Sequence, residues 1–280
     1  MSLTDMKIVA DSSADTLCFE GVAFASAPLK IITAEKEYTD DAALNVDGMV
    51  DDLLHYKGKS STACPGPADW IAAFGDAKYV FCLTITSNLS GSYNAACIAK
   101  EDYESAHPDR KVFVYDSLST GPEMRLVIEK NAALISEGKE FEEICREITA
   151  YGKKTGLIFM LESMRNLANN GRVSHLTAKA AGLLGIRAVG KASDEGTLQV
   201  LEKCRGEQKA LKAILQNMKD LGMRGGSIKI SHCDNLDAAN TLKAMILAEF
   251  NKAKIEIYRA RALVSFYAEK GGLLVGFEKN

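Results

Sequence analysis

Hydroxyl side chains gather in four stretches of the chain, three of which directly follow an apolar run. These stretches are Asp11–Ser13, Thr84–Tyr93, Asp116–Gly121 and the turn Ser60–Pro67. Hydroxyls and the backbone N–H groups of a loop that opens a helix can hold an anion. Ser, Thr, Asp and Gly are also the residues that cap helices and form turns, so one such loop is weak evidence. Four of them in one chain together predict an anion site.

The sequence motifs of several common catalytic and cofactor sites are absent. The chain has no GxxxxGK[ST], no GxGxxG after a strand, no GxSxG and no HExxH. Its seven cysteines form no CxxC pair, and its four histidines have no metal-ligand spacing. Ser90 precedes Gly91 and Ser92, but no general base can be assigned to it from the sequence. We therefore predict no metal and no cofactor, while a Ser or Thr nucleophile stays open as an alternative.

The elements that must position these loops alternate along the first half of the chain. Short apolar runs predict strands, and longer runs with apolar residues at helical spacing predict helices, the last of them divided near Gly138. A strand, loop and helix that repeat in this way predict an α/β layer with mainly parallel strands, whose loops converge at one edge of the sheet. The predicted strands are 7–10, 30–33, 78–84 and 110–115, and the predicted helices are 46–54, 93–100 and 124–151.

The second half predicts a mixed sheet, because a β-hairpin with Gly196 at its turn interrupts the alternation. The predicted strands are 156–161, 186–189, 197–202, 227–231, 255–258, 262–266 and 273–277, and the predicted helices are 162–168, 207–221 and 236–250. We place a domain boundary where polar residues interrupt the apolar pattern, which gives domains of residues 1–152 and 153–280. No Ser/Pro-rich linker separates them, so the two should pack closely.

The composition of the chain bears on which partners it can have and on where it is located. Of the 280 residues, 34 are Lys or Arg and 37 are Asp or Glu, for a formal net charge of −3. This balance gives no sign of a basic surface for nucleic acid. No apolar run approaches the roughly 18–20 residues of a membrane-spanning helix, and the first residues lack the layout of a secretion signal. An odd number of cysteines, several of them within apolar runs, favours reduced thiols. We therefore predict a cytoplasmic protein with no membrane span.

At the hydroxyl-rich loops the sequence resembles the bacterial DegV family of fatty-acid-binding proteins. The resemblance extends from Ile8 to about Phe277, and the Leu-Ser-Gly-Ser-Tyr stretch is its most specific part. It implies an α/β/α domain with a parallel sheet joined to an α/β domain with a mixed sheet, with the lipid between them. The matching segments are IVADSSAD (8–15), TACPGP (62–67), TSNLSGSYNAA (86–96), VYDSLSTG (114–121), LANNGRVS (167–174) and EGTLQVLEKCR (195–205).

The resemblance also implies which residues hold the ligand. Thr62 and Ser90 match the family's Thr and Ser that hold the carboxylate, and Arg172 matches an Arg at the pocket mouth. Gly91 beside Ser90, and Ser12 and Ser119 in two other loops, complete the set of predicted ligand-binding residues. We expect Asp11, Asp116 and Ser117 to order the loops rather than to touch ligand.

One departure from the family affects the predicted head-group site. A His near the C-terminus that often approaches the lipid head has no counterpart, because Ala268 and Glu269 stand in that stretch. We therefore expect a less polar site on that side.

Together the residues and the resemblance predict a protein that binds a long-chain fatty acid and is not itself an enzyme. The resemblance further implies that the catalytic subunit of a fatty acid kinase is the partner that phosphorylates the bound carboxylate. The alternative is a hydrolase or phosphotransferase that acts on a small carboxylate or phosphate, with Ser90 or Thr62 as its nucleophile. A third reading is a binding module for a different apolar ligand.

Overall fold

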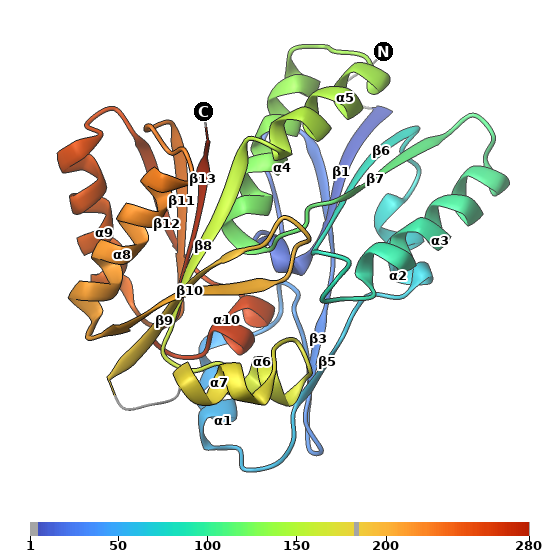
Figure 1. The fold of residues 1–280 in the computed structure, drawn as a ribbon. Coiled ribbons are helices and arrows are strands. Elements are labelled where there is room, and N and C mark those ends of the chain that lie inside the picture. The colour runs from blue at the N-terminus through green and yellow to red at the C-terminus, as the bar shows by residue number, and fades with distance from the viewer. Residues whose placement is uncertain (1–4, 182–184, 280) are drawn as a thin grey trace.

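The computed structural model describes residues 5–181 and 185–279 of the chain. Two large β-sheets form its main layers, and a small third sheet lies beside them (Figure 1). The first large sheet comes from the first half of the chain and the second comes from the second half. The predicted fold class, a parallel sheet in the first half and a mixed sheet in the second, is confirmed.

The first sheet has four parallel strands in the order β2-β1-β6-β7. Its strands carry apolar side chains on both faces, as expected for a parallel sheet that helices cover on both sides. Val9 and Cys82 pack with α2 and α3 on one face, whereas Ile8 and Phe81 pack with α4 and α5 on the other. The elements are β1 (Met6–Asp11), the 3-10 turn η2 (Ser12–Ala14), β2 (Ala23–Ala27), α2 (Pro67–Phe74), β6 (Tyr79–Thr84), α3 (Ser92–Ala106), β7 (Lys111–Asp116), α4 (Gly121–Ser136) and α5 (Phe141–Gly152).

The second sheet has six strands in the order β10-β9-β8-β13-β11-β12, and only β11 and β12 pair in parallel. Helices α8 and α9 cover one face. Helices α6 and α10 lie on the other face, which is turned toward the first half of the chain. The elements are β8 (Thr155–Leu161), α6 (Arg165–Asn169), α7 (His175–Ala181), β9 (Ile186–Ala192), β10 (Leu198–Arg205), α8 (Glu207–Asp220), β11 (Ser227–His232), α9 (Leu236–Glu249), β12 (Lys254–Arg259), α10 (Ala262–Ala268) and β13 (Leu273–Glu278).

Helix α4 packs against both large sheets (Figure 1). Met124 and Ile128 lie in the core of the first sheet. On its other side the helix meets β13 so closely that a Cβ atom at Gly276 would come within 2.5 Å of the Glu123 backbone nitrogen. A glycine is therefore needed at 276 to let the helix approach the strand.

The third sheet is antiparallel, in the order β4-β3-β5, and it seats Thr62 opposite Ile31. Helices α1 and α10 pack on it through Met49 and Phe266, so both halves of the chain contribute to this small core. Its elements are β3 (Lys30–Ile32), β4 (Glu37–Thr39), α1 (Val46–His55) and β5 (Ser61–Ala63).

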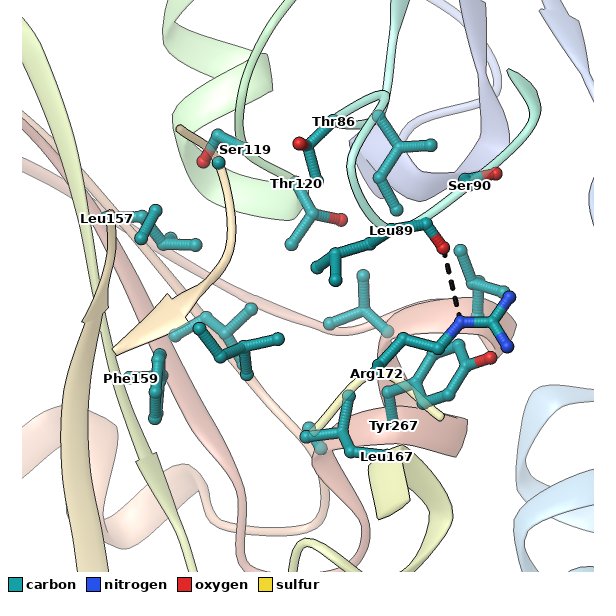
Figure 2. A pocket seen from close by; sticks show the side chains of 18 of the residues that line it. Thr86, Leu89, Ser90, Ser119, Thr120, Leu157, Phe159, Leu167, Arg172 and Tyr267 are labelled. Carbon is teal, nitrogen blue, oxygen red and sulfur yellow. Dashed lines mark hydrogen bonds between the residues drawn. The ribbon is translucent and has the colours of Figure 1, made fainter. Parts of the chain in front are cut away.

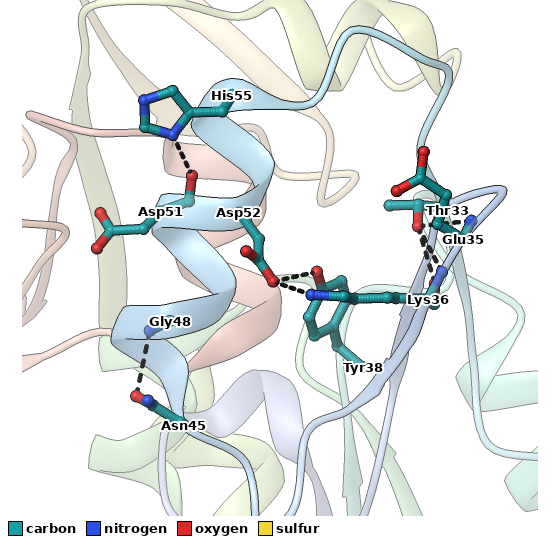
Figure 3. A network of polar contacts seen from close by, with 9 residues as sticks. All are labelled: Thr33, Glu35, Lys36, Tyr38, Asn45, Gly48, Asp51, Asp52 and His55. Atoms are coloured by element: carbon teal, nitrogen blue, oxygen red, sulfur yellow. Dashed lines mark hydrogen bonds and ion pairs between the residues drawn. The ribbon is translucent and has the colours of Figure 1, made fainter.

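Polar contacts fix α1 and the third sheet to their neighbours. Asp52 on α1 accepts hydrogen bonds from Lys36 Nζ at 2.6 Å and from the Tyr38 hydroxyl at 2.9 Å (Figure 3). These groups are exposed, so the pair contributes little to stability. Arg261 before α10 is better placed, because its Nε donates to the fully buried Asp40 at 3.1 Å. This ion pair joins the second half of the chain to the turn after β4.

The structure corrects two predicted elements. Residues 262–266 form the start of helix α10, not a strand. All five of these residues are buried. A short run that is buried at every position does not show whether its side chains repeat with the period of a helix or of a strand. The predicted strand at 30–33 is present as β3, but it belongs to the antiparallel third sheet rather than to the parallel layer. The division of 124–151 at Gly138 is confirmed, since that residue has φ of +75° between α4 and α5.

The predicted domain boundary at residue 152 falls between α5 and β8, and it stays a prediction. The expectation of close packing agrees with two contacts between the halves: α4 packs against strands of the second sheet, and both halves contribute to the small core on the third sheet. Within the described part of the chain, no helix combines the length and the apolar character needed to cross a membrane.

Candidate ligand-binding site

A pocket lies where the loops of the first sheet meet the face of the second sheet that carries α6 and α10. It encloses about 830 Å³ of space not occupied by atoms, its open mouth included. From the first half come residues next to β3, in β5 and in the loops after β6 and β7. From the second half come residues of β8, α6, α10, β13 and the β9–β10 hairpin. The site therefore exists only because the two halves pack together.

Most of the lining is aliphatic, and its polar groups are hydroxyls apart from one guanidinium. Its members are Leu29, Thr62, Ile85, Thr86, Leu89, Ser90, Leu118, Ser119, Thr120, Leu157, Phe159, Leu161, Leu167, Arg172, Ala192, Gly196, Thr197, Leu198, Leu263, Val264, Tyr267, Ala268 and Leu274. Arg172 is the one charged side chain among these described residues. An apolar pocket with a few polar groups is typical of a site for a small amphiphilic molecule.

The polar lining groups lie in two places: Thr86, Ser119 and Thr120 lie along the loops of the first sheet, and a second group that includes the one charged side chain lies at one end of the pocket (Figure 2). Ser90, Arg172 and Tyr267 lie on one side of the view, and Leu157 and Phe159 lie on the other. The Thr62 Oγ1 atom is 2.7 Å from the Tyr267 hydroxyl, which places Thr62 at the same polar end. This end therefore presents three hydroxyl groups and a guanidinium.

Arg172 owes its position to the turn that ends α6. Gly171 adopts φ of +74°, and the Arg172 N–H donates to the Leu167 carbonyl at 2.8 Å. This is the pattern of a helix C-terminal cap that a glycine closes. The Arg172 Nε donates to the Leu89 carbonyl at 3.2 Å, as Figure 2 shows. The guanidinium carbon also lies 5.9 Å from the centroid of the Tyr267 ring.

Four of the six predicted ligand-binding residues line the pocket, namely Thr62, Ser90, Ser119 and Arg172. Ser12 and Gly91 do not. Ser12 is fully buried and its Oγ accepts from the Leu29 N–H at 3.0 Å. Gly91 lies against the turn after β5, where a Cβ atom would be 3.3 Å from Cys64 Sγ. Both residues hold loops that carry lining residues, and their contact with a ligand stays a prediction.

Asp11 and Asp116 organise the loops, as predicted from their places in the sequence. Asp11 is fully buried, and its carboxylate accepts from the Ile85 N–H at 2.8 Å and from Ser92 Oγ at 2.7 Å. Burial raises the pKa of the Asp11 carboxyl, although these hydrogen bonds lower it in part. Asp116 Oδ1 accepts from the Ser87 N–H at 3.1 Å, which ties the loop after β7 to the loop after β6.

Two functional candidates were missed from the sequence. Tyr267 directly follows the segment 262–266, which was predicted to be a strand. In the structure it lies on helix α10, and this position brings its hydroxyl to Thr62. The Tyr267 hydroxyl supplies a polar group on the side of the predicted head-group site where Ala268 and Glu269 stand in place of the family's His. Burial raises the pKa of Tyr267, so the phenol stays protonated and able to donate.

Glu123 is the second missed residue, and it lies directly behind the pocket. Its carboxylate accepts from Ser119 Oγ at 2.5 Å and from Thr155 Oγ1 at 2.7 Å. Burial raises the pKa of the Glu123 carboxyl, and the two hydrogen bonds oppose that rise. A Glu in the first turn of a helix resembles an ordinary cap, so its sequence position gave no signal.

The fold and the pocket define a class of protein: a binding protein that encloses an amphiphile between two α/β layers. Comparison with known proteins agrees with that class. The model of the DegV family, described as "Uncharacterised protein, DegV family", matches residues 5–280. The chain belongs to the DegV family, which confirms the resemblance found in its motifs.

Relatives and solved structures cover nearly the whole chain. A DegV domain-containing protein of Streptococcus pneumoniae is 44% identical over 276 residues, which is 97% of this chain and 98% of the relative. The crystal structure of a DegV family protein from Eubacterium eligens, loaded with heptadecanoic acid, has a TM-score of 0.96 and 43% identity, and the match covers 98% and 100% of the two chains. The Streptococcus pneumoniae Fatty Acid Kinase (Fak) B3 protein, loaded with linoleic acid, has the same TM-score and identity over 98% of this chain and 99% of its own.

Proposed function

We propose that this protein binds a long-chain fatty acid, with the carboxylate at the polar end and the hydrocarbon chain along the aliphatic lining. The observation that carries the proposal is the pocket itself, whose described lining is mostly aliphatic and has its one charged side chain, Arg172, at one end together with Thr62, Ser90 and Tyr267. Two solved structures that are 43% identical hold heptadecanoic and linoleic acid, which supports the same ligand class here.

Physical chemistry assigns the two ends different tasks. Each methylene that leaves water contributes about 0.8 kcal/mol, so the acyl chain supplies most of the affinity. The carboxylate must keep its hydrogen bonds, because an unpaired buried charge is costly. The hydroxyls of Thr62, Ser90 and Tyr267 can donate to it, and Arg172 supplies the positive charge of this end.

We propose further that the protein is not an enzyme but presents its ligand to a fatty acid kinase. One structure that it matches over nearly its full length is a Fatty Acid Kinase B3 protein. Phosphorylation of the carboxylate raises the head-group charge from one to about two, and Arg172 is the cation placed to offset it. The partner is the catalytic subunit of such a kinase. A cytoplasmic location remains part of this proposal, supported by seven cysteines that form no disulfide within the described residues.

The alternative of a hydrolase or phosphotransferase finds little support. Ser90 and Thr62 hydrogen-bond no carboxylate and no imidazole among the described residues, so neither has a base to activate it. Glu123 contacts Ser119 instead, behind the wall of the pocket.

The experiment that tests the proposal is mass spectrometry of the intact protein purified under native conditions, followed by extraction and analysis of the released lipid. We expect a mass adduct that the extract identifies as a fatty acid. Delipidated protein should also take up fatty acid in a fluorescent displacement assay. A protein that carries no lipid and takes up no fatty acid contradicts the proposal.

A further inference from the structure

Strand β8 turns alternate side chains toward the pocket. Leu157, Phe159 and Leu161 line it, whereas Ile158 and Met160 face the core beneath α8 and α9. This alternation follows from the two-residue period of a strand. The wall that β8 gives to the pocket therefore consists of three large side chains, with Phe159 in the middle.

The neighbouring strand β9 carries small residues on the face that lies beside Phe159. Phe159 pairs directly with Gly190. A Cβ atom on Gly190 would lie 2.3 Å from Phe159 Cζ and 2.7 Å from Cε2, so the aromatic ring occupies the space above this glycine. The same face of β9 carries Ala188 and Ala192, which pack in one cluster with Phe159. The ring thus covers Gly190 and leaves room above its neighbour Ala192, which lines the pocket.

Phe159 also lies far from the groups that meet a carboxylate. In Figure 2 it stands with Leu157 on the side of the pocket opposite to Ser90 and Arg172. A ligand whose head is held by those polar groups directs its tail toward Phe159.

We propose that Phe159, seated over Gly190, is the residue that sets the longest acyl chain this pocket accepts. The inference rests on the proposed function and adds to it a determinant of ligand length. A ligand tail that reaches the Phe159 ring can become longer only if the ring moves. The ring cannot move toward the sheet, because it already lies against the backbone of Gly190. A chain that stops short of the ring loses about fourfold in affinity for each methylene not buried.

The test uses the full chain, delipidated and then offered an equimolar mixture of saturated fatty acids of about 14 to 22 carbons. The bound lipids are extracted and quantified. We expect Phe159→Ala to shift the preferred length upward by about two methylenes and to raise the ratio of the longer acid to the wild-type optimum about fifteenfold. Ala192→Leu fills space at the same end, so it should shift the preference to shorter chains.

Leu167→Ala is the matched control, because Leu167 lines the pocket near Arg172 (Figure 2). It should weaken all chain lengths alike and leave the optimum unchanged. If Phe159→Ala fails to fold, Phe159→Leu should give a smaller shift in the same direction. A wild-type length distribution in the folded Phe159 variant and in Ala192→Leu overturns the inference. Wild-type protein that takes up no fatty acid at all overturns the proposed function instead, and the inference with it.

Discussion

The Thr62 Oγ1 atom and the Tyr267 hydroxyl lie 2.7 Å apart although 205 positions separate them in the chain. Thr62 stands on a strand of the third sheet and Tyr267 on helix α10 of the second half. Each hydroxyl can donate to the other or to a third acceptor, so the pair can open toward an entering carboxylate without leaving a donor unsatisfied. The two halves of the chain thus meet at the polar end of the pocket.

Tyr267→Phe should weaken fatty acid binding about 10- to 100-fold, because it removes one hydrogen bond to a charged group. The ring remains, so its contact with Arg172 and the packing of α10 are kept. Affinity is measured by displacement of a fluorescent fatty acid, and the melting temperature serves as the control for folding. Unchanged affinity would show that the phenol does not reach the carboxylate.

Replacing both Thr62 and Ser90 by Ala should weaken binding far more than it weakens folding. Each charge-assisted hydrogen bond lost costs roughly 1.5–3 kcal/mol. Thr62→Ser retains the hydroxyl and provides the matched control, which should bind nearly as well as wild type. If the double Ala variant keeps its affinity in the displacement assay, these hydroxyls are not the carboxylate ligands.

Arg172→Ala should have a modest effect on fatty acid affinity and a large effect on turnover with a kinase. The hydrocarbon chain provides most of the binding, whereas the added phosphate charge needs a cation close by. The measurement is acyl-phosphate formation with a purified kinase and ATP. Arg172→Lys retains the charge and should recover part of the rate. Wild-type rates from the Ala variant would show that the Arg172 side chain has no part in the reaction, and that the residue only ends α6 through its backbone N–H.

Glu123 should make stability depend on pH. Its pKa is raised in the folded protein above its ordinary value of 4.5, so the folded state holds the proton more tightly than the unfolded state does. The resulting stabilisation is fully present below about 4.5 and is lost as the pH rises through the folded pKa. Glu123→Gln removes this titration, and its melting temperature should fall less steeply than that of wild type over that range. Parallel curves for the two proteins would contradict the assignment.

Gly196→Ala should disturb closure of the β9–β10 hairpin over the pocket. Gly196 has φ of +75°, and a Cβ atom there would lie 2.2 Å from Thr86 Oγ1 and 2.9 Å from the Leu118 Cα. Gly138 has the same φ with no atom within 4 Å of such a Cβ, so Gly138→Ala isolates the backbone strain of roughly 1–2 kcal/mol. Both variants should lose thermal stability, but only Gly196→Ala should release bound fatty acid faster. Equal release rates would mean that the turn does not cover the ligand.

The sequence could predict the loops of the site better than its helices. Ser90 and Ser119 follow buried strands of a parallel sheet, and such loops converge at one edge whatever the details of packing. Tyr267 could not be found in this way, because its segment is buried at nearly every position and its period is therefore hidden. The third sheet was missed as a unit because its strands have only three residues each and pair across distant parts of the chain.

The position of helix α4 between the two large sheets bears on how cooperatively the protein unfolds. Its Met124 side supports the core of the first sheet, while Arg125 Nη2 pairs with Glu256 of β12 at 2.6 Å and its first turn abuts Gly276 of β13. Neither sheet can lose this helix and keep its buried surface. Melting should therefore be a single cooperative transition in which the calorimetric and van't Hoff enthalpies agree, rather than two separate steps for the two halves.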